Sequence, residues 1–341
     1  MIRKTIRALI LLGLAIGPST AADFPQTEIT NGEIRAKLYL PDGKRGFYTS
    51  TRFDWSGVIY SLVYKGHEYY GTWFHRVDPK VKDIAYEGDL IVSEPYTAIV
   101  GPAEEFETGG LALGYLEAKP GGTFIKIGVG VLRKVDDSRY HHSKPYEIVD
   151  GGKWSVKKSR DAANFRHVLR DPSSGYAYDY QKTVSLTKGK PEMVISHVLK
   201  NTGTLPIDTT VYNHNFLYLD NQPPGPDFAI TFPFQLKARR APNKELGEIR
   251  GNQLVYLKTL EGQERLHVFL EGFGNTAKDY DIRIENRKVK AGVRITSDRP
   301  LSALSCWSIR TSLSPEPFQA MKIEPGKQVA WKITYEYYTL P

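Results

Sequence analysis

Short runs in which apolar and polar residues alternate recur along most of the chain. Examples are TFIKIGVGVLRK at 123–134, PEMVISHVLK at 191–200 and QVAWKITYEYY at 328–338. A period of two is typical of strands that bury one face. Turn-forming clusters such as PDGK at 41–44 and EPGK at 324–327 separate the runs at hairpin spacing. Long helical periodicity is almost absent, so we predict an all-β fold, a large antiparallel sandwich with few short helices.

Two polar, turn-rich segments, 74–110 and 134–165, are least like strands. We expect them to cover a sheet edge or to form the rim of a ligand site. No clean linker and no repeat of fixed period is visible. We therefore predict a single domain over residues 23–341.

The first 22 residues have the pattern of a secretory signal peptide. Basic MIRKTIR is followed by apolar ALILLGLAIG and by small residues in PSTAAD. The apolar run is too short to span a bilayer comfortably. We expect cleavage after Ala22, with Ala21 as the alternative site; an uncleaved N-terminal anchor is the other interpretation. The mature protein is expected to be periplasmic or secreted, with no membrane insertion.

The charge of the chain is mildly basic. There are 46 Lys and Arg against 38 Asp and Glu, and the net charge of +8 falls to +5 when Arg3, Lys4 and Arg7 leave with the signal peptide. This excess tolerates an anionic partner, but no dense basic stripe interleaved with aromatics indicates nucleic acid, and we expect no nucleic-acid partner. Cys306 is the single cysteine, so no internal disulfide can form.

One predicted strand carries an unusual polar triplet. In TVYNHNFLYLD, residues 210–220, Asn213, His214 and Asn215 interrupt β-branched and aromatic residues. A histidine in a strand is more often a core or edge residue with its nitrogens satisfied. Three adjacent hydrogen-bonding side chains give a strand no structural advantage, however. We therefore predict that the triplet faces a cavity and contacts a ligand there.

Three motifs together resemble the galactose mutarotase (aldose 1-epimerase) family. NHNFLYLD at 213–220 is similar to its Asn-His-x-x-Phe strand, and SPEPFQAMKIEPGKQVAWKITYEYY at 314–338 looks like its last strands. STRFDWSGVIYSLVYKGHEYYG at 50–71 looks like its first strand pair. The resemblance implies a β-supersandwich fold. The chain departs from the family where Asn215-Phe216 follows the histidine and where Phe318 follows the Glu-Pro pair.

The resemblance also implies roles for individual residues. His214 would donate a proton to a sugar ring oxygen, and Glu316 would take the proton of the anomeric hydroxyl from across the ring. An imidazole and a carboxylate form a suitable acid–base pair. Arg52 would hold a hydroxyl or carboxylate through its fork of donors. Trp73 and Trp307 are candidates for stacking on the sugar.

Each of these residues also has a structural interpretation. Glu316 could be an exposed loop acid, and Arg52 could pair with Asp54 or Glu68 on the sheet surface. The two tryptophans are more often core residues than sugar platforms.

The remaining histidines give no strong signal. His75 is a positional candidate for the first sugar-contacting histidine of the family, although nothing around it matches the family's loop closely. His141 and His142 lack the fixed spacing of a zinc site. We expect neither a metal nor an organic cofactor.

The sequence therefore predicts an exported protein that binds a sugar or glycan and has aldose 1-epimerase activity. One rival is a polysaccharide lyase acting on uronate polymers, in which Tyr212, Asn213 and His214 would be assembled around the reacting carbon. The lyases of this fold generally carry an added helical domain for which this chain has no room. The other rival is a non-catalytic periplasmic glycan-binding module.

Overall fold

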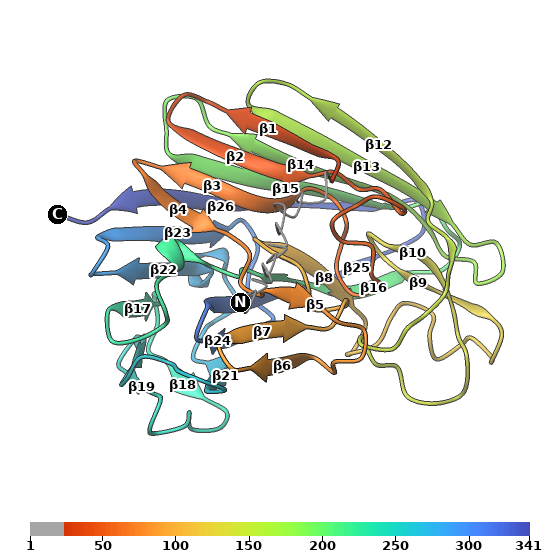
Figure 1. The fold of residues 1–341 in the computed structure, drawn as a ribbon. Helices are drawn as coiled ribbons and strands as arrows, with labels where there is room; N and C mark the ends of the chain where they lie inside the picture. The colour runs from red at the N-terminus through yellow and green to blue at the C-terminus, as the bar shows by residue number, and fades with distance from the viewer. Residues whose placement is uncertain (1–23) are drawn as a thin grey trace, which may run out of the picture.

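A computed structural model describes residues 24–341, and the expected signal peptide lies outside the described residues. This part of the chain forms five β-sheets and two short 3₁₀ helices, η1 (Leu219–Asn221) and η2 (Ala277–Asp279) (Figure 1). The largest sheet has ten strands in the order β12 (Lys153–Lys158), β13 (Ala162–Arg170), β14 (Ala177–Leu186), β15 (Glu192–Asn201), β26 (Gln328–Thr339), β23 (Ala291–Ser297), β22 (Asp281–Asn286), β17 (Phe228–Thr231), β20 (Gln253–Tyr256) and β19 (Gly247–Arg250). All its pairings are antiparallel, as the alternating pattern predicts.

A second sheet carries the candidate site. Its six strands are β18 (Lys237–Ala238), β21 (Arg265–Glu271), β24 (Ala303–Ile309), β25 (Ser312–Ile323), β16 (Ile207–His214) and β8 (Ala103–Glu107). Strands distant in sequence are neighbours here, because β16 lies between β25 and β8. Groups separated by about a hundred residues therefore meet on one face.

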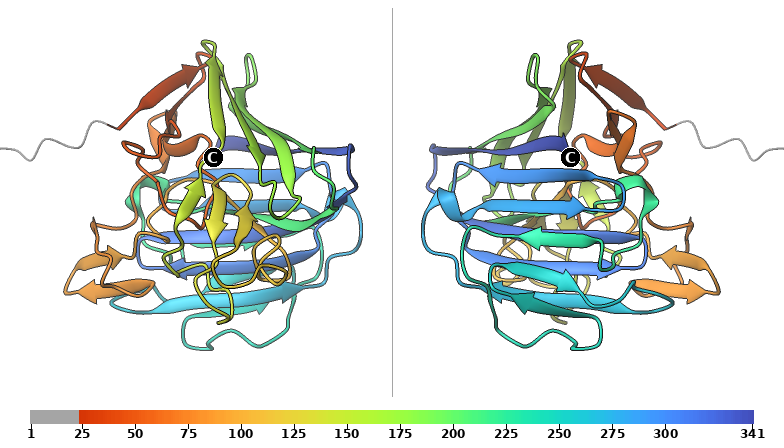
Figure 2. Two further views of the ribbon diagram at one scale, coloured as in Figure 1. Left: turned by 90° about the vertical axis from the view of Figure 1, so that its right-hand side faces the viewer. Right: turned by 90° about the vertical axis from the view of Figure 1, so that its left-hand side faces the viewer.

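Three smaller sheets complete the described fold. They are β1 (Gln26–Thr30), β2 (Ile34–Tyr39), β3 (Val58–Tyr64) and β4 (His67–Tyr70); β5 (Arg76–Val77), β7 (Leu90–Ser93) and β6 (Ile84–Glu87); and β11 (Ile148–Asp150), β10 (Gly130–Arg133) and β9 (Thr123–Lys126). Figure 1 and the left view of Figure 2 place β9–β11 and its loops at one end of the molecule.

The ten-stranded and six-stranded sheets pack face to face. One face of β14, β15 and β26 is buried at alternate positions, and this face contributes to a hydrophobic cluster that includes residues from Ile29 to Tyr337. Polar contacts cross between the two sheets as well. Glu104 of β8 contacts Lys182 of β14 and His197 of β15, all three fully buried. The predicted β-sandwich is confirmed, in the form of a supersandwich of large antiparallel sheets.

The segments predicted to be least like strands are only partly loops. Residues 76–93 form the small β5–β7 sheet, and 103–107 is β8, a strand of the central six-stranded sheet. Lys82, Thr97 and the 141–143 segment, which belong to these two segments, line the cavity of the candidate site.

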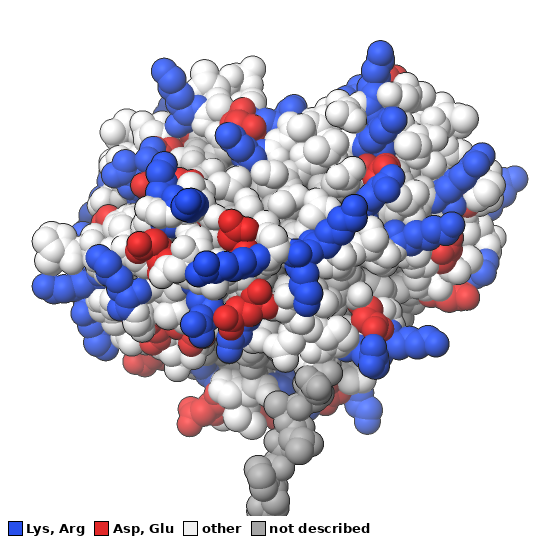
Figure 3. All heavy atoms as spheres, turned by 90° about the horizontal axis from the view of Figure 1, so that it is seen from above, with Lys and Arg blue, Asp and Glu red and all other residues white. Residues whose placement is uncertain are grey.

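Within residues 24–341 no helix has the length and apolar character needed to cross a membrane. On the face shown in Figure 3, lysines and arginines are interspersed with acidic residues.

Candidate functional site

A row of side chains crosses the six-stranded sheet on one face. The register pairs Phe269 of β21 with Ser305 of β24, and Ser305 with Glu316 of β25. The same register, extended by two residues beyond Tyr212 opposite Phe318, sets His214 of β16 opposite Glu316. Side chains at paired positions share a face, so antiparallel pairing alone brings residues 214 and 316 together.

This row forms the floor of a cavity of about 490 Å³, a size that suits a small ligand. Loops from the β5–β7 sheet and the 134–147 segment form its walls. The lining residues are Arg52, Lys82, Asp83, Thr97, Glu107, His141, His142, Ser143, Tyr212, His214, Phe216, Arg265, His267, Phe269, Ser305, Trp307, Glu316 and Phe318.

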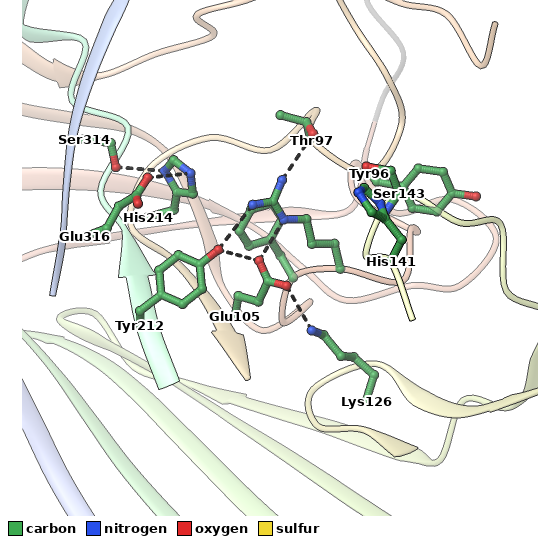
Figure 4. A network of polar contacts seen from close by, with 12 residues as sticks. Tyr96, Thr97, Glu105, Lys126, His141, Ser143, Tyr212, His214, Ser314 and Glu316 are labelled. Carbon is green, nitrogen blue, oxygen red and sulfur yellow. Dashed lines mark hydrogen bonds and ion pairs between the residues drawn. The ribbon is translucent and has the colours of Figure 1, made fainter. Parts of the chain in front are cut away.

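His214 and Glu316 are in direct contact. Nε2 of His214 lies 2.9 Å from Oε1 of Glu316. The other ring nitrogen lies 2.8 Å from Oγ of Ser314 (Figure 4). Ser305 donates a hydrogen bond of 2.5 Å to the second oxygen of Glu316. Burial opposes ionisation of Glu316, but His214 and then Ser305 keep its pKa below the ordinary value.

This contact corrects one expectation. The two groups were expected on opposite sides of a pyranose ring, with the carboxylate across the ring from the imidazole. They instead touch, because β16 and β25 are neighbouring strands and the two side chains occupy paired positions. Both residues are only 6% exposed, yet both line the cavity, so the pair presents one edge to a ligand.

Stacked aromatic rings fix the plane of the imidazole. Phe216 stacks on His214 with ring centroids 4.0 Å apart, and Trp73 stacks on the far side of Phe216 at 5.4 Å. Trp307 meets His214 edge-on at 5.7 Å. Phe216 has a φ of 27°, a sparsely populated conformation for a bulky residue that the packing around it maintains.

Beside this pair lies a buried ionic cluster. Arg52 donates from Nε to Glu105 at 2.7 Å, and Lys126 donates to the other oxygen of Glu105 at 3.0 Å. The hydroxyl of Tyr212 also donates to Glu105, and Arg52 reaches Tyr212 and Thr97 through its terminal nitrogens (Figure 4). Despite burial, Lys126 and Arg52 hold the pKa of Glu105 well below its usual range.

Two further titratable groups of the cavity have displaced pKa values. Burial, and then the Glu105 carboxylate, raise the pKa of Glu107 to about 7. Burial and the positive charge of Arg52 lower the pKa of His142 to about 4. At neutral pH His142 is therefore uncharged, and Glu107 exchanges its proton readily.

The structure does not place Asn213 and Asn215 in the cavity. Both are 1% exposed and point to the opposite face, toward the ten-stranded sheet. Asn213 donates to Glu104 at 3.2 Å, while Asn215 donates to the Pro315 carbonyl and accepts from Tyr335. The prediction that all three polar residues face the ligand is corrected, because successive side chains of a strand point to opposite faces.

Of the other predicted site residues, two line the cavity and two do not. Trp307 and Arg52 line the cavity. Trp73 is 1% exposed and donates to the Ile99 carbonyl, so it supports Phe216 and does not reach the cavity. His75 is exposed outside the cavity and accepts a hydrogen bond from the backbone of Ile91.

The sequence reasoning missed several residues of the site. Glu105 and Glu107 lie in AEEFE, 103–107, a run that reads as polar although its alternate residues share a face. His267 pairs in register with Trp307 and lies on the same face. The period-two alternation of β8 and β21 is the sequence signal that could have identified these residues.

Within residues 24–341 no group of three or more His, Cys, Asp or Glu side chains is placed to hold a metal ion. Phe318 stacks on Tyr212 at 4.3 Å and closes the floor next to the ionic cluster. The arrangement thus offers proton exchange at His214 and Glu316, with fixed donors beside it.

Comparison with solved structures identifies the fold. A galactose mutarotase-like protein from Lactobacillus casei matches with a TM-score of 0.51 and 13% identity, covering 92% of this chain and 100% of that one. The chain has the galactose mutarotase-like fold. A putative aldose 1-epimerase from Escherichia coli K12 matches at 0.51 and 10% identity, over 92% of this chain and 100% of that one.

An aldose epimerase homologue from C. elegans matches at 0.53 and 13% identity, over 94% of this chain and 100% of that one. Comparison of the sequence with protein-family models finds no match, and neither does comparison with curated proteins. The galactose mutarotase-like fold extends over almost the whole described chain, at 10–13% sequence identity to these solved structures.

Proposed function

We propose that this protein binds a carbohydrate in the cavity and interconverts its anomers, as an aldose 1-epimerase does. The observation that carries the proposal is the 2.9 Å contact between Nε2 of His214 and Oε1 of Glu316 on the cavity floor. The resemblance in sequence and the fold of the solved structures support the same chemistry.

Direct contact between the two groups suits an anomeric centre. The ring oxygen and the anomeric hydroxyl are bonded to one carbon, so an acid and a base that act on them need to be neighbours. His214 gives a proton to the ring oxygen while the bond from that oxygen to the anomeric carbon breaks. Glu316 takes the hydroxyl proton as the carbonyl forms. Closure on the other face of the carbonyl, with both protons returned, yields the other anomer.

The proton exchange leaves the pair electrically balanced. An imidazolium and a carboxylate become a neutral imidazole and a carboxylic acid, so the net charge of the pair stays zero. A buried site favours such an exchange, since an unpaired charge there is costly. The lowered pKa of Glu316 keeps it ionised, and thus ready to act as the base, at neutral pH.

Other lining groups are suited to gripping the sugar. Arg52 has five N–H donors and uses three nitrogens on Glu105, Thr97 and Tyr212, which leaves two N–H groups for a ligand. Trp307, 8% exposed, offers an aromatic edge to the cavity.

A second candidate function is β-elimination from a uronate polymer. The observation that favours it is Arg52 beside His214, since a guanidinium can neutralise a carboxylate while a base removes the neighbouring proton. Burial and the Glu105 carboxylate raise the pKa of Tyr212 far above its ordinary value, so its hydroxyl stays protonated at neutral pH and is not available as a base. Asn213 points away from the cavity. His214 would have to act alone, so we rank this function second.

Relaxation of fresh α-glucose and α-galactose, followed by polarimetry or NMR, tests the proposal. We expect acceleration by the parent protein and a loss of at least about a hundredfold in His214→Ala and Glu316→Gln, as removal of an acid or base entails. Glu324→Gln, an exposed acid after β25, is the matched control.

Parent-like rates in both site variants would refute the acid–base roles. A new near-ultraviolet absorbance with alginate or pectate would instead support the lyase. Retention by a glycan without either reaction would support a binding module.

We also propose export, from the sequence pattern of residues 1–22. Mass spectrometry of the mature N-terminus tests it, with Asp23 expected as the first residue. An intact Met1 in the cell-envelope fraction would point to an uncleaved anchor.

A further inference from the structure

The central cavity adjoins a second hollow of about 600 Å³. Lys82, His141 and Ser143 line both. The backbone also links the two, because Thr97 bonds Arg52 in the central cavity while Tyr96 lines the second hollow. In Figure 4, Tyr96, Ser143 and His141 lie on the opposite side of Thr97 and Glu105 from the His214–Glu316 pair. A ligand that fills the central cavity can therefore extend past Arg52.

The second hollow is basic. Lys80, Lys82 and Lys144 line it together with a single acid, Glu94. Thr97 and Ser143 both donate hydroxyl hydrogen bonds to one oxygen of the Glu94 carboxylate, Oε1. Lys144 pairs with Asp136, whereas within residues 24–341 neither Lys80 nor Lys82 forms an ion pair. Two cations are thus free to meet a negative group in the hollow.

The walls of the hollow also suit a sugar ring. Tyr96 is half-buried, which leaves part of its ring for contact, and Pro79, Pro95 and Pro145 make the remaining surface apolar and stiff. The Ser143–Glu94 hydrogen bond ties the loop after β10 to the loop after β7 across the hollow. The shape is therefore fixed by contacts from both loops.

We propose that this second hollow binds an acidic sugar unit joined to the unit in the central cavity, so that the substrate is an acidic oligosaccharide. The proposal rests on the proposed function for the identity of the central ligand as a sugar. The negative group is a carboxylate or a sulfate, which share the chemistry that lysines recognise. Lys80 and Lys82 contact it, and Tyr96 contacts the ring.

Calorimetry at a fixed salt concentration tests the proposal. It measures the binding of ladders, which are series of oligosaccharides of one to four units built from the same sugar. The probes are oligogalacturonates and oligomannuronates for carboxylates, carrageenan oligosaccharides for sulfates, and cello- and galacto-oligosaccharides as neutral ladders. On one acidic ladder we expect affinity to rise by about tenfold or more from one unit to three. The neutral ladders should gain less.

Single-residue variants test whether the added sugar unit binds in the second hollow. Lys80→Ala should lower trimer affinity by about two- to fivefold, as exposed ion pairs do, and Lys80→Arg should restore it. Arg240→Ala is the matched control, because Arg240 lines a third hollow that adjoins the central cavity through His267 and Phe269. Loss in Arg240→Ala without loss in Lys80→Ala would place the chain in the third hollow and overturn the proposal.

The proposal would also be overturned if affinity did not change with chain length on any acidic ladder. An increase in affinity with chain length that is as large on a neutral ladder as on the acidic ones would overturn it as well. These failures are separable from failure of the proposed function. Interconversion of a free monosaccharide without any effect of chain length refutes the second hollow alone. If affinity rises with chain length in a way that depends on Lys80, but no sugar anomers are interconverted, only the proposed epimerase activity is refuted. Absence of both refutes both.

Discussion

Substitution of Glu107 by Gln should make the free energy of unfolding less dependent on pH as the pH rises. Glu107 lines the cavity, and no side chain within residues 24–341 donates a hydrogen bond to its carboxyl. Burial and the Glu105 carboxylate raise its pKa to about 7, from an ordinary value of 4.5. The folded state thus holds a proton that the unfolded chain releases between these two pH values.

The sign follows from that difference in bound protons. Where the folded state binds more protons, the free energy of unfolding falls as the pH rises, by about 1.4 kcal/mol per pH unit. The stability associated with protonated Glu107 is complete below about pH 4.5 and is lost as the pH approaches 7. The full interval corresponds to about 3 kcal/mol, and solvent screening at the cavity surface reduces this to about 1–3 kcal/mol.

Urea unfolding of the parent and Glu107→Gln at pH 5, 6, 7 and 8 measures the effect. Gln imitates the protonated acid, so the two proteins should differ little at pH 5. At pH 8 the variant should be the more stable by about 1–3 kcal/mol. A stability difference that stays constant from pH 5 to pH 8 would show that Glu107 ionises as an ordinary exposed acid and would refute the reasoning.

Three other substitutions should change stability. Lys182→Met should cost about 3–5 kcal/mol in urea unfolding, because it leaves the buried Glu104 carboxylate without its lysine; a cost below about 1 kcal/mol would contradict a buried ion pair there. Asn213→Ala should cost about 1–3 kcal/mol by the same measurement, since Glu104 loses a buried donor; an unchanged midpoint would place the amide in solvent. Trp73→Ala should cost about 3–5 kcal/mol through the cavity left under Phe216, and an unchanged melting temperature would argue against the stack.

The fold was predictable because alternation is a local signal. Strands such as β14 and β15 bury every second residue, and their sequences show it directly. Strand β8 escaped prediction for a physical reason. Its AEEFE sequence is buried only because Arg52 and Lys182, far away in sequence, neutralise its carboxylates. A single sequence does not reveal which distant charges will meet.

The site was predictable in part. The resemblance paired His214 with Glu316, and the strand register brings these two residues together. The same period-two alternation that predicted the strands also implied that Asn213 and Asn215 point away from His214, and the triplet hypothesis overlooked it. The contact distance could not be predicted, since it depends on β16 and β25 being neighbours in the sheet.

Consecutive carboxylates on β8 connect the cavity to the interior. Glu105 faces the cavity and binds Arg52, whereas Glu104 faces the ten-stranded sheet and binds Lys182 and His197. Both carboxylates are fully buried, so each side of the strand is held by charges that cannot move apart without exposing an unpaired ion. The position of Arg52 relative to His214 is therefore set from both faces of one strand. Changes at Glu104 or Lys182 should thus alter the proposed sugar binding as well as stability, although neither residue reaches the cavity.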